Sequence, residues 1–137
     1  MSSMGMHDAA PPGAFEFYLG GSAGPSLYVR LVGGRLLYEW AANGSYSGAV
    51  MEAAPTPEEW ARFRETADRL GVREWEPQYL SPHSCCDVTY WYLKMELDGQ
   101  KIVVQGADAY PASTGPNVSK EFREFFRAVK NLVGLEP

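Results

Sequence analysis

The clearest pattern in the chain is an alternation of apolar and polar positions that leads into a tight turn. From Thr89 to Leu97 the odd positions are mainly apolar, while the even positions are tyrosine or charged residues. This period of two predicts a half-buried β-strand. Asp98-Gly99 follows at once and favours a type I′ turn, because glycine adopts positive φ without steric cost. The pattern therefore predicts a hairpin in which a second strand, 100–106, runs back along the first.

A two-residue turn also fixes the register of this hairpin. Trp91 is expected to face Gly106 on the apolar side, where a large ring covers a residue without a side chain. On the other side Glu96 is expected to face Lys101, which is a favourable pair of opposite charges. Both faces of the hairpin are therefore consistent with one register.

The same register, continued past the second strand, brings two loops together at one end of the hairpin. It places Thr89 close to Asp108 and Asp87 close to Tyr110. The loop before the first strand then meets the loop after the second. We therefore expect one small region to combine the side chains best suited to chemistry, which are His83, Cys85, Cys86, Asp87, Asp108 and Tyr110.

A second hairpin is predicted between residues 26 and 40. Segments 26–32 and 35–40 flank Gly33-Gly34, and a two-residue loop there again places the apolar residues of both strands on one side. Segments 15–19 and 46–53 are shorter candidate strands. The chain thus carries strands both before and after its middle.

Two segments have the spacing and the end signals of helices. Thr56 and Glu59 form a capping box before an apolar stripe of helical period, and Gly71 ends that helix. Ser119 is the expected cap of the second helix, whose apolar residues recur with the same period until Gly134. Each helix therefore has one apolar face with which to cover a sheet.

The order of strands, helix, hairpin and helix predicts a fold of the α+β class. We expect a single domain with a largely antiparallel sheet of about five to six strands and two helices packed on one face. A chain of 137 residues is typical of one domain. Residues 14–137 would form it, and residues 1–13 would be a disordered amino-terminal tail.

Composition narrows the class of protein. The net charge is −5, and charges of both signs are interspersed, which argues against nucleic-acid binding. No apolar run approaches the length of a membrane span, and the amino terminus lacks the features of a secretory signal. Cys85 and Cys86 are adjacent, and neighbouring cysteines rarely bridge, so reduced thiols are expected. These observations favour a cytoplasmic protein without a membrane or nucleic-acid partner.

Several residues also follow a pattern seen in other chains. They are Pro55 to Trp60, Gly71-Val72, Trp75, Tyr79, Asp87 with Trp91, and Ala109-Tyr110-Pro111. In these residues the chain resembles a group of uncharacterised small bacterial proteins, over residues 15–132. It departs from the group at Asp87-Val88, where Asp-Gly is expected. The resemblance implies a single domain and assigns no activity.

The segment from His83 to Asp87 contains residue types that bind metals or act as nucleophiles. A structural zinc site usually needs two separated pairs of ligands, and this chain has one compact cluster, so we expect no metal. A thiol with His83 as its base would instead suit a small enzyme. No glycine-rich phosphate loop is present, and we expect no cofactor.

Aromatic residues suggest a different role for the same stretch. Tyr90 and Tyr92 lie on the non-core side of the predicted hairpin, with Trp75 and Tyr79 close in sequence. Exposed aromatic residues are typical of interaction surfaces. We therefore expect a non-catalytic binding module whose partner is another protein or a second copy of the chain.

The expected binding surface combines this tyrosine face with loops 78–87 and 108–117. The alternative is a small enzyme, or a metal or thiol site, built from His83, Cys85, Cys86, Asp87 and Asp108. Both readings place the functional region at the same end of the hairpin.

Overall fold

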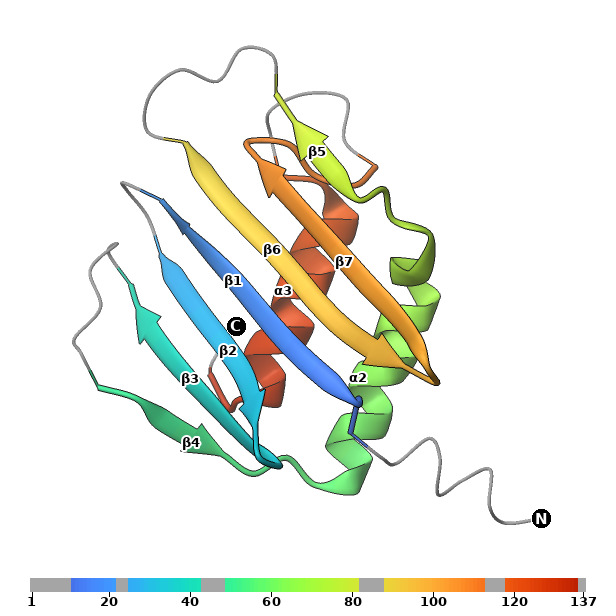
Figure 1. Ribbon diagram of the computed structural model, residues 1–137. Coiled ribbons are helices and arrows are strands. Elements are labelled where there is room, and N and C mark those ends of the chain that lie inside the picture. Colours follow the sequence, from blue (N-terminus) through green and yellow to red (C-terminus); the bar gives the residue numbers. More distant parts are fainter. Residues whose placement is uncertain (1–10, 22–24, 43–48, 82–87, 113–117, 136–137) are drawn as a thin grey trace.

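The computed structural model describes residues 11–21, 25–42, 49–81, 88–112 and 118–135. In these residues a seven-stranded sheet carries both long helices on one face (Figure 1). The strands are β1 (Ala14–Gly21), β2 (Ser26–Val32), β3 (Arg35–Ala41), β4 (Met51–Ala53), β5 (Gln78–Leu80), β6 (Thr89–Leu97) and β7 (Gln100–Ala107). The helices are α2 (Pro57–Arg69), the 3₁₀ turn η1 (Val72–Glu74) and α3 (Lys120–Leu132). The α+β class with helices on one face is confirmed.

The two predicted hairpins are joined into one sheet by β1. The strand order is β4-β3-β2-β1-β6-β7-β5, and all neighbours are antiparallel except β5 and β7. Phe17 in β1 lies opposite Val29 on one side and Leu93 on the other. The first strand of the chain is therefore the middle strand of the sheet (Figure 1).

The predicted registers are confirmed in both hairpins. Trp91 lies opposite Gly106 and Glu96 opposite Lys101, and β2 pairs with β3 as the two-residue loop requires. In the turn between β6 and β7, Asp98 has φ 53° and Gly99 has φ 80°. Positive φ at both central residues is the signature of a type I′ turn.

One part of the expected loop 78–87 is instead a strand, so that interpretation was wrong for its first residues. Gln78–Leu80 forms β5, which pairs parallel to β7 and places Tyr79 opposite Gly106. Three residues are too short to show an alternation that could be read from sequence. The candidate strand 46–53 is a strand at Met51–Ala53, and residues 43–48 lie outside the described residues.

The beginning of the domain is anchored just before β1. Pro12 is buried, and the Gly13 amide donates to the Glu96 carbonyl at 2.9 Å. These residues belong to the expected tail 1–13, whose first ten residues lie outside the described part. The contacts of the described domain thus include residues 12 and 13, before the expected start at residue 14.

The helix end signals have the expected geometry. The Thr56 hydroxyl accepts from the Glu59 amide at 3.1 Å, and the Glu59 carboxylate accepts from the Thr56 amide at 2.8 Å. The Ser119 hydroxyl accepts from the Phe122 amide at 3.1 Å. Caps of this kind satisfy amides that have no partner inside the helix. They fix where α2 and α3 begin.

Aromatic rings fill the space between the helices and the sheet. Phe17 in the middle strand lies 5.8 Å from Phe125 of α3, and Phe15 lies 5.4 Å from Phe63 of α2, measured between ring centroids. Phe17 and Phe125 are fully buried. Burial of such rings supplies the largest share of the hydrophobic stabilisation. We call this the covered face of the sheet.

A cluster of charges ties α2 to the turn between β6 and β7. The Arg64 guanidinium donates to both carboxylate oxygens of Asp98, at 2.9 and 3.1 Å, and Arg73 donates to the same carboxylate at 2.9 Å. The hydrogen bond from Arg64 is the main reason that the pKa of Asp98 is lowered, and the hydrogen bond from Arg73 is the second. The turn therefore has a structural role beyond its backbone geometry.

Candidate functional site

The face of the sheet opposite the helices is not covered by any element of the described chain (Figure 1). We call it the open face. Several large apolar or aromatic side chains are exposed on it. Leu80 is 62% exposed, Tyr90 56% and Val103 59%. A solvated sheet face normally carries polar residues, so these three positions call for an explanation.

Charged residues occupy one half of the open face, toward the turns that close the two hairpins. Arg35 and Glu52 form an ion pair of 2.6 Å across β3 and β4. Arg30 and Glu39 form another of 2.8 Å across β2 and β3. We call this region the charged half. Its ion pairs join neighbouring strands and satisfy their charges within the sheet.

The other half of the open face is uncharged on β5, β6 and β7 and on the facing part of β1. The side chains that it presents are Tyr18, Gln78, Leu80, Tyr90, Tyr92, Gln105 and Ala107. We call them the tyrosine surface. It lies at the end of the sheet where β6 begins (Figure 1).

The tyrosine surface is hollowed over β7. Ala107 in β7 is small, and Tyr90 and Tyr92 flank it from β6 while Gln78 and Leu80 flank it from β5. The walls offer ring faces, and the two glutamines of the surface add amide groups. A hollow with apolar walls and a few polar groups is a typical place for an anchoring side chain of another molecule.

A half-buried acid, Glu16, orients two of the tyrosines next to this hollow. Tyr92 donates its hydroxyl hydrogen to Glu16 at 2.5 Å, and Tyr28 donates to the same oxygen at 2.9 Å. Burial, together with the hydrogen bond to Glu16, raises the pKa of Tyr92, and the bond from Tyr92 lowers the pKa of Glu16. Tyr18 stacks on Tyr92 with ring centroids 5.7 Å apart. The rings are therefore held in place without any partner.

At the end of the hairpin the predicted meeting of the two loops is confirmed for Thr89 and Asp108. The Thr89 amide donates to the Asp108 carboxylate at 2.9 Å, and the Asp108 amide donates to the Thr89 carbonyl at 2.9 Å. Asp108 has φ 50°, a conformation that aspartate tolerates in turns. Its carboxylate closes the hairpin.

The other residues of the expected chemical cluster, His83, Cys85, Cys86 and Asp87, lie outside the described residues. Their convergence with Asp108 stays a prediction. Among the residues that are described, no group of three or more His, Cys, Asp or Glu side chains could hold a metal ion.

Three aromatic residues that the sequence grouped with the expected site instead lie on the covered face. Tyr110 is 5% exposed and stacks parallel to Trp91 at 6.3 Å. Tyr79 stacks on Trp91 with ring centroids 6.1 Å apart, and Trp75 contacts Trp91 edge-on at 6.2 Å. Gly106 lies between Trp91 and Tyr79 in the sheet and leaves room for their rings to meet. Tyr90 and Tyr92 alone of the expected aromatic interface lie on the open face.

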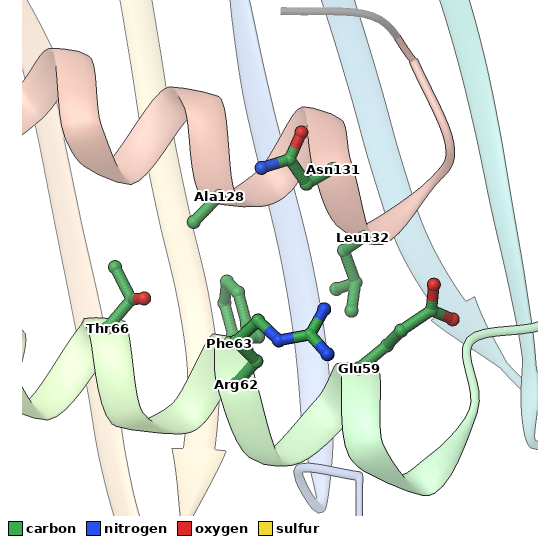
Figure 2. A pocket seen from close by; sticks show the side chains of 7 residues that line it. All are labelled: Glu59, Arg62, Phe63, Thr66, Ala128, Asn131 and Leu132. Carbon is green, nitrogen blue, oxygen red and sulfur yellow. The ribbon is translucent and has the colours of Figure 1, made fainter.

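The helix layer carries a shallow groove between α2 and α3 (Figure 2). Phe63 and Leu132 supply its apolar lining, and Asn131 borders it from α3. Arg62 and Glu59, which have opposite charges, also line it (Figure 2). A groove with both charges selects no ligand charge, and we assign no function to it.

Comparisons with protein-family models, with curated proteins and with solved structures give no match. No helix within the described ranges is long and apolar enough to cross a membrane.

Sequence reasoning found part of that geometry. The alternation in β6 placed Tyr90 and Tyr92 on the side away from the core. Leu80 was included within the expected loop 78–87, but not as part of a strand beside these tyrosines. Tyr18 was missed, since its position depends on the central place of β1. The alternation within segment 15–19 was the only available signal for Tyr18.

Proposed function

We propose that this domain is a non-catalytic binding module whose tyrosine surface docks onto another protein. One observation carries the proposal. On an uncovered sheet face, the lining of the hollow over β5, β6 and β7 is aromatic and has no charged side chain, with Tyr90 and Leu80 more than half exposed. The charged residues Glu16 and Lys94 border it at Tyr92. Centres of protein interfaces are enriched in aromatic residues and depleted of charge, and the lining of the hollow has that composition.

The fixed geometry of the tyrosines supports the same function. Binding costs free energy when mobile side chains become ordered. Glu16 and Tyr18 already hold the Tyr92 ring in place by a hydrogen bond and a stacking contact. Tyrosine also offers a large contact area with few rotatable bonds. A partner would therefore meet a surface that is largely preorganised.

The charged half would form the boundary of the interface. Its arginine and glutamate side chains are already paired with one another across the strands. Removing such pairs from water costs more than it returns unless the partner replaces every contact. The centre of the interface is therefore expected over the hollow at Ala107, between Tyr90 of β6 and Leu80 of β5.

A photoreactive phenylalanine analogue placed at position 90 or at position 103 tests this proposal. Tyr90 and Val103 are 56% and 59% exposed on the same face, so an analogue at either position is equally accessible to a neighbouring molecule. After irradiation of intact cells, we expect a cross-linked product from position 90 and little from position 103. A second copy gives a product of twice the chain mass, and a different partner is identified by mass spectrometry. Equal yields at the two positions, or no product at position 90, would refute the proposal.

A further inference from the structure

A cavity of about 380 Å³ lies on the covered side of the sheet, where β1 ends, β6 begins and α3 starts. It is separate from the tyrosine surface, with which it shares no lining residue. Small-molecule sites span roughly 300–1,000 Å³. The volume therefore suits a ligand at the small end of that range.

The walls of the cavity are mostly apolar. Leu19 comes from β1, and Phe122 and Phe126 lie one turn apart on α3. Phe122 is also part of the ring cluster around Trp91, at 4.7 Å. Such walls select a ligand whose body is apolar.

Tyr110 supplies a polar group that the fold does not use. Its side chain lines the cavity and is only 5% exposed. Its hydroxyl has no hydrogen-bond partner among the residues that are described. Every fully enclosed side-chain oxygen in those residues has a partner, so the Tyr110 oxygen is not one of the fully enclosed atoms. The hydroxyl oxygen is therefore reachable from outside the protein. A tyrosine hydroxyl is protonated at neutral pH, and burial, followed by the negative charge of Asp108, raises the pKa of Tyr110 further.

Arg123 is the one charged residue among the described residues that line the cavity. Its Nη2 donates to the Val118 carbonyl at 3.1 Å, which leaves further guanidinium donors. The amino-terminal end of α3, with its partial positive charge, begins at Lys120 beside the same wall. Asp108 does not line the cavity, although its charge acts on Tyr110, and its carboxylate accepts from the Thr89 amide. The polar side of the cavity therefore favours an anion.

We propose that this cavity binds a small apolar carboxylic acid. The apolar body would lie against Leu19, Phe122 and Phe126, and the carboxylate would face Arg123 and the Tyr110 hydroxyl. Arginine matches a carboxylate with paired donors, and a tyrosine hydroxyl adds a third. This binding site is independent of the tyrosine surface.

Titration calorimetry with three eight-carbon probes of different charge tests the charge preference on the unmodified protein. We expect octanoate to bind, 1-octanol to bind at least about tenfold more weakly, and octylamine not to bind, because charged hydrogen bonds contribute about 1.5–3 kcal/mol. Comparable affinity for octanol or octylamine, or no binding of octanoate at millimolar concentration, would overturn the proposal.

Variants then locate the site. Arg123→Met should weaken octanoate binding about tenfold and Tyr110→Phe about fivefold, since each removes a donor to the carboxylate. Arg62→Met is the matched control, because Arg62 is an exposed arginine on the other helix and lines a different groove (Figure 2). It should bind octanoate as the wild type does. Unchanged affinity in Arg123→Met, or an equal loss in Arg62→Met, would contradict the assignment.

Discussion

Trp91 and Tyr90 are neighbours in β6 and point to opposite faces of the same sheet. Trp91 is 1% exposed and contacts the rings of Trp75, Tyr79 and Tyr110. Tyr90 is 56% exposed and makes no ring contact or side-chain hydrogen bond within the described residues. The two rings are similar in chemistry, yet only one of them contributes to packing.

The difference separates residues that hold the fold from residues that are free for another role. Hydrophobic stabilisation grows with the apolar area removed from water. The covered face therefore accounts for most of the free energy of folding, and Tyr90 and Leu80 account for little of it. Their place on an uncharged, hollowed part of the open face is explained by binding, as proposed above.

The largest effect on stability is expected at Gly106, which lies under Trp91. A Cβ atom there would lie within 2.5 Å of Trp91 Cε2 and 2.7 Å of the Ala109 carbonyl oxygen. The same carbonyl accepts the Trp91 indole hydrogen bond at 2.9 Å. We expect Gly106→Val to lower the free energy of unfolding by about 3 kcal/mol, because overpacking and a lost hydrogen bond act together. Urea denaturation measures this change.

The neighbouring residue provides the control for that variant. Ala107 is in the same strand but lies in the hollow of the open face. Ala107→Val should change the free energy of unfolding by less than about 0.5 kcal/mol, as surface substitutions usually do. Similar losses in both variants would show that the two faces do not differ as described.

The assignment of the β7 residues to opposite faces of the sheet could be predicted from the sequence, because a two-residue turn fixes which residues share a face. Asp98-Gly99 placed Gly106 under Trp91, and Gly33-Gly34 fixed the register of the other hairpin. Pairing between distant segments could not be predicted in the same way. No turn links β1 to β6, so the central place of β1 was outside the reach of local patterns.

The candidate site shows the same limit of local reasoning. Alternation alone placed Tyr90 and Tyr92 away from the core. Tyr79 was grouped with the site because it is near in sequence, and Tyr110 because the continued register placed it close to Asp87. Both rings instead stack on Trp91 on the covered face. For Tyr79 that outcome depends on the parallel pairing of the three-residue strand β5, which has no periodicity to read.

A smaller effect, which depends on pH, is expected at Glu16 on the open face. The hydrogen bond from Tyr92 is the main reason that the pKa of Glu16 lies below its usual value. Ionised Glu16 therefore stabilises the fold above the unfolded pKa of about 4.3, and this contribution is lost as the pH falls through the lower folded pKa. We expect Glu16→Gln to cost about 1 kcal/mol at neutral pH, since a charged hydrogen bond is lost at a partly exposed site.

Denaturation of both proteins over a range of pH checks this prediction. The difference between wild type and Glu16→Gln should shrink as the pH falls below the unfolded pKa of glutamate. A difference that stays constant with pH would mean that the charge of Glu16 does not contribute, and that the variant acts through packing alone.

The smallest effect on stability is expected at the two most comparable exposed positions, Tyr90 and Val103. Substitution of either by lysine removes little buried area, because both are more than half exposed. We expect Tyr90→Lys and Val103→Lys each to change the free energy of unfolding by less than about 0.5 kcal/mol. A larger loss in Tyr90→Lys would assign this tyrosine a role in the fold.

The most direct test of the binding function compares these two lysine variants in their affinity for the partner captured by cross-linking. A charge in the uncharged centre should weaken binding about thirtyfold or more in Tyr90→Lys. Val103→Lys should stay within about threefold of wild type, because Val103 lies opposite Lys94 and outside the hollow. Equal affinity of Tyr90→Lys and wild type, with both proteins folded, would contradict the account.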